Sequence, residues 1–144
     1  MTLVSDVMTA PVVTATRVTS YREIAHLLAS HQIGGLPVVL MDQRVAGVIT
    51  EADLVAARDK EAWRARTGNT AGQHWFSGHQ HAAILAGELM TAPAVIIHPE
   101  QTVATAAQVM TAHRVSRLPV VDSGGTLIGI VSQGDLLGAL ARRR

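Results

Sequence analysis

A short apolar run that ends in a hydroxyl residue and is followed three residues later by an aspartate occurs twice in the chain. The two copies are Gly-Val-Ile-Thr-Glu-Ala-Asp at residues 47–53 and Gly-Ile-Val-Ser-Gln-Gly-Asp at residues 129–135. If a strand ends at the hydroxyl and a helix begins after it, the helix N–H groups and the hydroxyl face one space, where anions are favoured. The aspartate in the first helical turn can accept hydrogen bonds from both hydroxyls of a ribose. The pattern is therefore typical of a site for a nucleoside or a nucleotide.

The same residues also have an ordinary structural role. Thr50 and Ser132 are good N-caps of a helix, and Asp53 and Asp135 are favourable in the first turn, near the positive end of the helix. Ligand binding and helix capping both fit these residue types, so the two interpretations stay open at this point.

The two motifs belong to a longer internal repeat. Val-Met-Thr-Ala-Pro ends at Pro11 and Leu-Met-Thr-Ala-Pro ends at Pro93, which is 93 − 11 = 82 residues later. Leu-Pro-Val-Val returns at the same spacing, at residues 36–39 and 118–121. Ungapped repetition over roughly fifty residues indicates that one structural unit has been duplicated. A single unit would bury too little apolar surface to be stable alone, so we expect the two copies to share a core.

Each copy is predicted to fold in the order β-α-β-β-α. The β-branched segments at residues 12–15 and 95–97 are expected to be short strands, and Ser20 and Thr102 are expected to cap the helices that follow. The glycine pair at residues 34–35 is expected to end the first of these helices. Two strands and a final helix complete each copy, with strands at residues 36–40, 45–50, 118–121 and 127–132 and helices from Glu51 and from near Gln133.

Composition excludes several classes of protein. The chain has 144 residues, and its formal net charge of +1 argues against a nucleic-acid-binding protein with a broad basic face. It has no cysteine, so thiol catalysis and disulfides are excluded. No apolar run approaches the roughly 18 residues that span a bilayer, and no signal peptide is apparent, so we expect a cytoplasmic protein that binds neither membrane nor nucleic acid. No phosphate-loop, zinc-protease or nucleophile-elbow motif occurs, and we do not expect an enzyme.

The repeated motifs resemble those of a tandem pair of cystathionine-β-synthase (CBS) domains, often called a Bateman module. The resemblance rests on Val-Met-Thr-Ala-Pro, Leu-Pro-Val-Val and the two Gly-to-Asp motifs, and it covers residues 3–58 and 85–141. It implies an α/β (α+β) fold of two β-α-β-β-α repeats packed with pseudo-two-fold symmetry. The first repeat would span residues 1–66, a linker residues 67–84, and the second repeat residues 85–144. It also implies a non-catalytic regulatory module that binds adenosine-containing ligands in the clefts between its repeats.

The resemblance also assigns roles to individual residues. Asp53 and Asp135 resemble the carboxylates that bind ribose, and Thr50 and Ser132 resemble the hydroxyls beside ribose or phosphate. The implied ligand is an adenine nucleotide such as AMP, ADP or ATP, and neither a cofactor nor a metal is required. The adenine side would be lined by Thr14, Thr16, Ile96 and His98, and by backbone groups near Ile33, Pro37, Val115 and Pro119.

The two copies differ at the residue that precedes Leu-Pro, which is Gly35 in the first copy and Arg117 in the second. In nucleotide-binding members of the family this residue is often an arginine that reaches the ligand of the other repeat. We therefore expect Thr50, Asp53 and Arg117 to form a site that accepts phosphate, and Asp135 to lie in a more neutral site. An exposed salt bridge is the alternative role for Arg117.

Other functions fit parts of the sequence. A constitutive interaction scaffold with vestigial clefts would keep the fold without binding a ligand. A metal-responsive module could use His74, His79 and His81, because imidazole is a common metal ligand. The family resemblance also implies a homodimer and an effector protein that the sequence does not identify.

Overall fold

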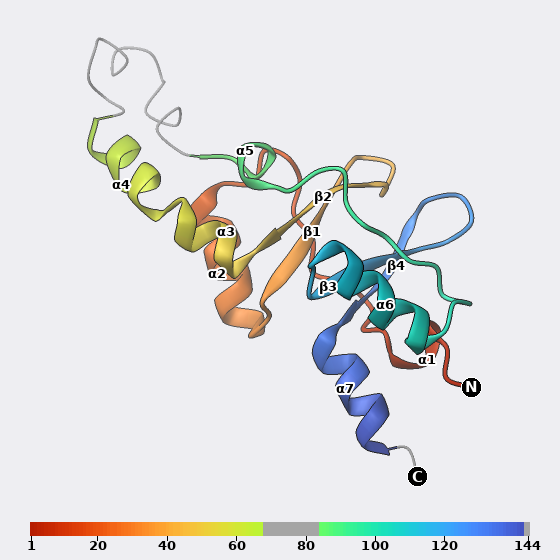
Figure 1. Ribbon diagram of the computed structural model, residues 1–144. Helices are drawn as coiled ribbons and strands as arrows, with labels where there is room; N and C mark the ends of the chain where they lie inside the picture. Colours follow the sequence, from red (N-terminus) through yellow and green to blue (C-terminus); the bar gives the residue numbers. More distant parts are fainter. Residues whose placement is uncertain (68–83, 143–144) are drawn as a thin grey trace. The chain divides into compact units, whose positions relative to one another are not determined.

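The computed structural model describes residues 1–67 and 84–142, including the side chains of all of these except residues 63–67. Strands β1 and β2 form one two-stranded sheet, and β3 and β4 form another, so the chain has the predicted mixed fold class. None of the helices within the described ranges combines the length and the apolar character that a membrane crossing needs. The elements follow in the order α1 (Val4–Val7), α2 (Tyr21–His31), β1 (Gly35–Val39), β2 (Val45–Thr50), α3 (Glu51–Ala56), α4 (Arg58–Thr67), α5 (Ala86–Leu89), α6 (Val103–His113), β3 (Arg117–Val121), β4 (Leu127–Ser132) and α7 (Gln133–Arg142) (Figure 1).

The chain divides into two compact units, and each is built from segments that are separated in the sequence. Unit 1 consists of Met1–Val13, Val39–Ala46 and Pro93–Arg144, and unit 2 consists of Thr14–Val38 and Gly47–Ala92. Helices α1, α6 and α7 and the β3–β4 hairpin therefore belong to unit 1, whereas helices α2 to α5 belong to unit 2. The β1–β2 hairpin contributes its tip to unit 1 and its remaining residues to unit 2.

In unit 2, helix α2 has well-defined contacts at both ends. The Ser20 hydroxyl accepts a hydrogen bond from the Glu23 N–H (3.2 Å), which confirms the predicted N-cap. Gln32 follows the last helical residue in the left-handed conformation (φ 54°), and its N–H donates to the Ala29 carbonyl (3.3 Å). The helix therefore ends before the glycine pair that was expected to end it, because a non-glycine residue adopts the left-handed conformation at its C-terminus.

In unit 1, the β3–β4 hairpin and helix α6 bury their apolar faces against each other. The strands are antiparallel, with Arg117 opposite Ser132, and an irregularity in the register lies between Val120 and Val121. Thr102 caps α6 by accepting a hydrogen bond from the Thr105 N–H (3.0 Å), as predicted. One buried apolar cluster of this unit consists of Val4, Ile97, Ala106, Met110, Leu118, Val120, Val131 and Leu136.

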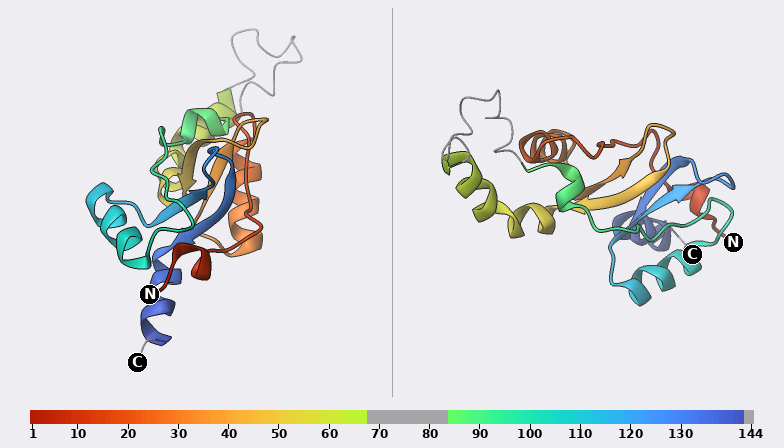
Figure 2. Two further views of the ribbon diagram at one scale, coloured as in Figure 1. Left: turned by 90° about the vertical axis from the view of Figure 1, so that its right-hand side faces the viewer. Right: turned by 90° about the horizontal axis from the view of Figure 1, so that it is seen from above.

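Helix α1 packs with the second repeat although it precedes the first repeat in the sequence. The Val4 N–H donates to the Gln101 carbonyl (2.8 Å), and the Thr9 N–H donates to the Ile130 carbonyl (2.8 Å). Figures 1 and 2 show α1, in red, beside the cyan and blue segments of unit 1. The start of the chain therefore completes the hairpin and the helix entry of the other repeat.

Helix α5 makes the reciprocal contacts in unit 2. The Ala86 N–H donates to the Thr19 carbonyl (2.8 Å), and the Thr91 N–H donates to the Val48 carbonyl (2.9 Å). Each of these residues is related to its counterpart in unit 1 by the repeat offset, as in 86 − 4 = 82. The two repeats have thus exchanged their N-terminal segments, so that the compact units differ from the continuous sequence repeats.

The first strand expected in each copy is reduced to a single parallel bridge. The Ala15 N–H donates to the Pro37 carbonyl and the Ile97 N–H donates to the Pro119 carbonyl, at 3.0 Å in both cases. A longer ladder would need an N–H from the same proline, and proline has none. The β-branched residues therefore lie extended beside the neighbouring strand without forming a strand of their own.

Candidate functional site

The Thr50–Asp53 pair caps helix α3 through reciprocal hydrogen bonds. The Thr50 N–H donates to Asp53 Oδ2 (2.8 Å), and the Asp53 N–H donates to Thr50 Oγ1 (3.3 Å). The Thr50 hydroxyl also donates to Asp53 Oδ2 (3.1 Å). This arrangement is a capping box with aspartate in the place of the usual glutamate, so the structural interpretation of this pair is confirmed.

The Ser132–Asp135 pair has the same arrangement at the start of α7. The Ser132 N–H donates to Asp135 Oδ2 (2.8 Å), and the Asp135 N–H donates to Ser132 Oγ (3.1 Å). Both aspartates are half-buried, and in both the capping bonds use Oδ2 alone. No residue in the described part of the chain donates to the Oδ1 atom of Asp53 or Asp135. Capping therefore leaves one acceptor oxygen of each carboxylate available to a ligand.

Backbone hydrogen bonds bring the other predicted segments of each unit to these caps. The Glu51 N–H donates to the Gly34 carbonyl, and the equivalent Gln133 N–H donates to the Ser116 carbonyl, both at 2.9 Å. The loop that contains Ile33 therefore lies at the start of α3 in unit 2, and the loop that contains Val115 lies at the start of α7 in unit 1. The bridges to Pro37 and Pro119 hold the segments of Ala15 and Ile97 against β1 and β3, which are the strands that follow these two loops.

Two of the predicted residues have side chains that are engaged within their own surroundings. His98 Nδ1 lies 2.9 Å from the Val121 carbonyl, so Nδ1 carries the hydrogen and donates it. Thr16 is exposed and forms a turn in which its N–H donates to Thr19 Oγ1 (3.0 Å) and its hydroxyl lies 3.4 Å from the same oxygen. Both residues follow the bridge residue of their segment, and their side chains stabilise that segment locally.

Arg117 is half-buried at the start of β3, and its counterpart Gly35 is fully buried at the start of β1. Arg117 belongs to unit 1 and Asp53 to unit 2. The combination of these two residues in one phosphate site therefore stays a prediction from the sequence.

A cavity of about 310 Å³ adjoins Asp53 in unit 2, and the sequence did not predict it. It is lined by Asp53, by Lys60 from α4 and by Glu88 from α5, among others. Glu88 Oε2 accepts a hydrogen bond from the Leu85 N–H (3.0 Å), which places its carboxylate at the start of α5. Both positions carry the same charge in the two repeats, because Glu88 corresponds to Asp6 (88 − 6 = 82) and Lys60 corresponds to Arg142 (142 − 60 = 82). This repeated charge is the sequence signal that could have identified Lys60 and Glu88.

Residues 1–67 and 84–142 contain no group of three His, Asp or Glu side chains that could hold a metal ion. The histidines considered for a metal-responsive module, His74, His79 and His81, lie outside the described residues.

Comparisons with known proteins agree with the repeat. The family model described as "CBS domain" matches twice, at residues 4–60 and 86–142. The CBS domain-containing protein YhcV of Bacillus subtilis is 31% identical over 137 residues, which cover 94% of this chain and 84% of that protein.

Two solved structures share the fold over the whole chain. The structure of CBSX2 from Arabidopsis thaliana in complex with AMP is 26% identical with a TM-score of 0.78, covering 99% of this chain and 98% of that one. The CBS domain pair of protein MJ0100 in complex with 5′-methylthioadenosine and S-adenosyl-L-methionine is 26% identical with a TM-score of 0.80, covering 100% and 99%. The repeated caps, the two-stranded sheets and both family matches lead to one conclusion: the chain belongs to the CBS domain family and carries two copies of the domain.

Proposed function

We propose that the chain is a non-catalytic regulatory module that binds adenosine-containing ligands at the Thr50–Asp53 and Ser132–Asp135 pairs. A partner protein responds to ligand occupancy through a change in conformation. The observation that carries the proposal is the second carboxylate oxygen of each aspartate, which accepts no hydrogen bond from a described residue. One oxygen caps the helix, and the other, which has two lone pairs, remains for the two ribose hydroxyls.

The ligands of the relatives support the adenosine part of the proposal. AMP, 5′-methylthioadenosine and S-adenosyl-L-methionine are named with the two similar structures. These molecules share adenine and ribose and differ in what the 5′ carbon carries, which is a phosphate, a thioether or a sulfonium group. A carboxylate that binds ribose recognises the shared part, so we propose adenosine itself as the common requirement.

The expected affinity follows from the number of hydrogen bonds that the site can offer. A hydrogen bond to a charged group contributes about 1.5–3 kcal/mol. Two such bonds from one ribose, together with burial of adenine, reach a binding free energy of about −8 kcal/mol, which corresponds to a micromolar Kd. That range suits a protein that responds to changes in the concentration of a metabolite.

Calorimetric titration of the ligand-free protein with AMP, 5′-methylthioadenosine and S-adenosyl-L-methionine tests the proposal. Asp53→Asn and Asp135→Asn keep an oxygen that can cap the helix but remove the charge and one acceptor. Each change is expected to lower the affinity of its site about tenfold or more, because it removes a charge-assisted bond to ribose.

The matched control is Asp6→Asn in α1, where Asp6 Oδ2 accepts the Leu3 N–H (2.9 Å) in the same kind of helix cap. This variant should bind adenosine ligands as the unchanged chain does. Absence of binding with all three ligands would favour the scaffold interpretation. A loss of affinity in Asp6→Asn equal to that in Asp53→Asn would show that the effect comes from stability.

Arg117 is the residue that we propose to select the 5′ group. Its guanidinium can bind a phosphate through two hydrogen bonds, whereas a thioether offers no such partner. Arg117→Ala should therefore weaken AMP binding and leave 5′-methylthioadenosine binding unchanged. Equal affinities of the variant and the unchanged chain for AMP would assign Arg117 to a structural role.

A second copy of the chain is part of the proposal. Val55 on α3 and Leu137 on α7 occupy equivalent positions (137 − 55 = 82), and their exposures are 72% and 67%. Two exposed aliphatic residues at matched positions are suited to contact with another copy. Sedimentation should give a dimer, and the double change of Val55 and Leu137 to glutamate should give a monomer.

A further inference from the structure

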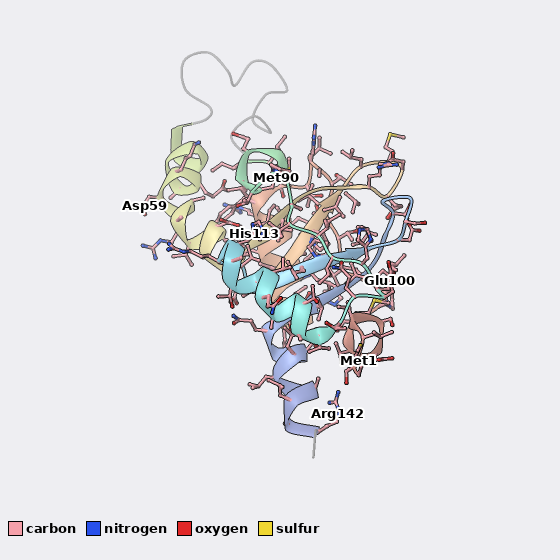
Figure 3. All side chains as sticks on the ribbon, turned by 45° about the vertical axis from the view of Figure 1, so that its right-hand side comes forward. Met1, Asp59, Met90, Glu100, His113 and Arg142 are labelled. Atoms are coloured by element: carbon pink, nitrogen blue, oxygen red, sulfur yellow. The ribbon has the colours of Figure 1, made fainter. Side chains whose placement is uncertain are left out.

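The cavity of about 310 Å³ in unit 2 carries two charged side chains that neither the α3 cap nor the proposed ribose contact uses. Lys60 lines the cavity from α4 and Glu88 lines it from α5, so opposite charges come from two different helices. Figure 3 labels Asp59, which precedes Lys60 in α4, and Met90, which follows α5. None of the ion pairs among the described residues includes Lys60, so its charge is available to a ligand.

The rest of the cavity lining is mainly aliphatic. It consists of Asp53 and of four apolar residues, Ala56, Ala57, Ile84 and Leu89. Ile84 is buried with 1% exposure, and two hydrogen bonds hold its backbone. Its carbonyl accepts the Tyr21 N–H (2.8 Å), and its N–H donates to Glu61 Oε1 (3.4 Å). The cavity therefore combines an apolar wall that is fixed in place with two side chains of opposite charge.

The cavity lies on the side of α3 and α4 that faces α5. Asp53, Ala56, Ala57 and Lys60 stand three or four residues apart, which places them on one face of these adjoining helices. Val55, which we propose to contact a second copy of the chain, comes two residues after Asp53 and lies about 200° around the helix from it. The cavity and the exposed Val55 side chain are therefore on different sides of α3.

We propose that this cavity binds the zwitterion of a small aliphatic α-amino acid. The Lys60 ammonium pairs with the carboxylate of the ligand, and the Glu88 carboxylate accepts hydrogen bonds from its ammonium group. The aliphatic side chain of the ligand lies against Ile84 and its apolar neighbours. Sites for small molecules occupy roughly 300–1,000 Å³, and this cavity is at the lower end of that range, so the ligand must be small.

The balance of charge in the lining favours a zwitterion. An anion would meet the carboxylates of Asp53 and Glu88 against the single ammonium of Lys60. A cation would pair with the carboxylates and leave Lys60 without a partner, and an uncharged apolar molecule would take charged groups out of water without pairing them. Lys60 and Glu88 are both exposed, so each pair with the ligand is weak, and we expect a Kd of about 1 mM or below.

Titration of the full chain, labelled with ¹⁵N, with L-leucine tests the proposal. Saturable shifts are expected in the amide signals of residues 53–60 and 84–89. Lys60→Gln and Glu88→Gln should each weaken L-leucine binding about threefold or more, because each removes one charged partner. Leucinamide lacks the carboxylate and 4-methylpentanoate lacks the ammonium group, so both should bind more weakly than L-leucine by a similar factor.

Arg58→Gln and Asp59→Asn are the matched controls, because each removes a charge from α4 at a residue that does not line the cavity. Both should bind L-leucine as the unchanged chain does, and Lys60→Gln should bind 5′-methylthioadenosine normally, which separates this site from the adenosine sites. The proposal is overturned if L-leucine causes no saturable shifts, if leucinamide or 4-methylpentanoate binds as tightly, or if Arg58→Gln weakens binding as much as Lys60→Gln. It is also overturned if Lys60→Gln and Glu88→Gln weaken only the binding of S-adenosyl-L-methionine, because the zwitterion would then be part of an adenosine ligand.

Discussion

Replacement of Gly47 by alanine should separate the exchanged segment of unit 2 from strand β2. An alanine Cβ at this position would lie 2.7 Å from the Thr91 carbonyl oxygen and 2.9 Å from the Met90 sulfur. The Met90 side chain can move away, but the Thr91 carbonyl is part of a backbone bridge. The Val48 N–H donates to it (3.1 Å), and the Thr91 N–H donates back to the Val48 carbonyl (2.9 Å). The alanine therefore fits only if this bridge opens or the strand shifts.

The magnitude follows from these contacts. Loss of two backbone hydrogen bonds costs about 1 kcal/mol each, and overpacking a close contact costs about 1–3 kcal/mol. Restriction of the unfolded chain by alanine offsets about 0.4–1 kcal/mol of this. We expect Gly47→Ala to lower the free energy of unfolding by about 2–4 kcal/mol, which for a chain of this length lowers the melting temperature by about 6–12 °C.

The duplicated chain provides two matched comparisons. At the equivalent Gly129, the nearest atoms to an added Cβ are the Met8 sulfur (2.5 Å) and Met8 Cγ (3.0 Å), and the Thr9 carbonyl oxygen lies farther away (3.3 Å). The long Met8 side chain can move, so Gly129→Ala should cost only about 1 kcal/mol. At Gly124 the Cβ would meet only Asp122 Oδ1 at 3.5 Å, which is ordinary contact, and Gly124→Ala should leave stability unchanged.

Thermal and urea unfolding, monitored by circular dichroism, measure the loss of stability in each of the three variants. The loss of stability should be largest for Gly47→Ala, smaller for Gly129→Ala and smallest for Gly124→Ala. The reasoning is refuted if Gly129→Ala is as destabilising as Gly47→Ala, or if Gly47→Ala melts within about 2 °C of the unchanged chain.

Three other changes test local features of the fold. Gly138→Ala, in the interior of α7 with only the end of Arg142 near the added Cβ (3.5 Å), should raise the free energy of unfolding by about 1 kcal/mol in urea titration. Gly125→Ala should lower it by about 1–2 kcal/mol, because φ is +90° and the Cβ would lie 2.7 Å from Arg44 Nη1. Thr50→Ala should lower it by about 1 kcal/mol through loss of the α3 cap, whereas Thr50→Ser should restore it.

The parts of the fold that depend on local chemistry could be predicted from the sequence. Strand β2 and strand β4 begin and end where the apolar runs do, and the hydroxyl residues Ser20 and Thr102 cap the expected helices. The exchange of α1 and α5 could not be predicted, because four-residue helices have no periodic pattern and their partners lie far away in the sequence. The reduction of the expected strands at residues 12–15 and 95–97 to single bridges could not be predicted either. It depends on a proline, Pro37 or Pro119, in the strand that faces each segment.

In the candidate site too, local features could be predicted from the sequence and contacts between distant segments could not. The hydroxyl–aspartate pairs were identified because capping is local, and their geometry leaves one oxygen of Asp53 and of Asp135 for a ligand. The glycines that begin the two motifs, Gly47 and Gly129, lie against the exchanged segments, and the sequence analysis did not identify this contact.

The exchange of N-terminal segments has a consequence for the origin of the chain. Residues 1–67 and 84–144, expressed as separate polypeptides, should copurify in equal amounts, because each half carries the segment that completes the hairpin of the other. A single ancestral repeat would have obtained that segment from a sister molecule, and its folding would have depended on concentration. Joining two repeats in tandem places the donor of the segment on the same polypeptide at a high effective concentration. Dilution then no longer separates the two repeats. Each repeat can acquire its own substitutions while the exchanged N-terminal segments keep the repeats paired.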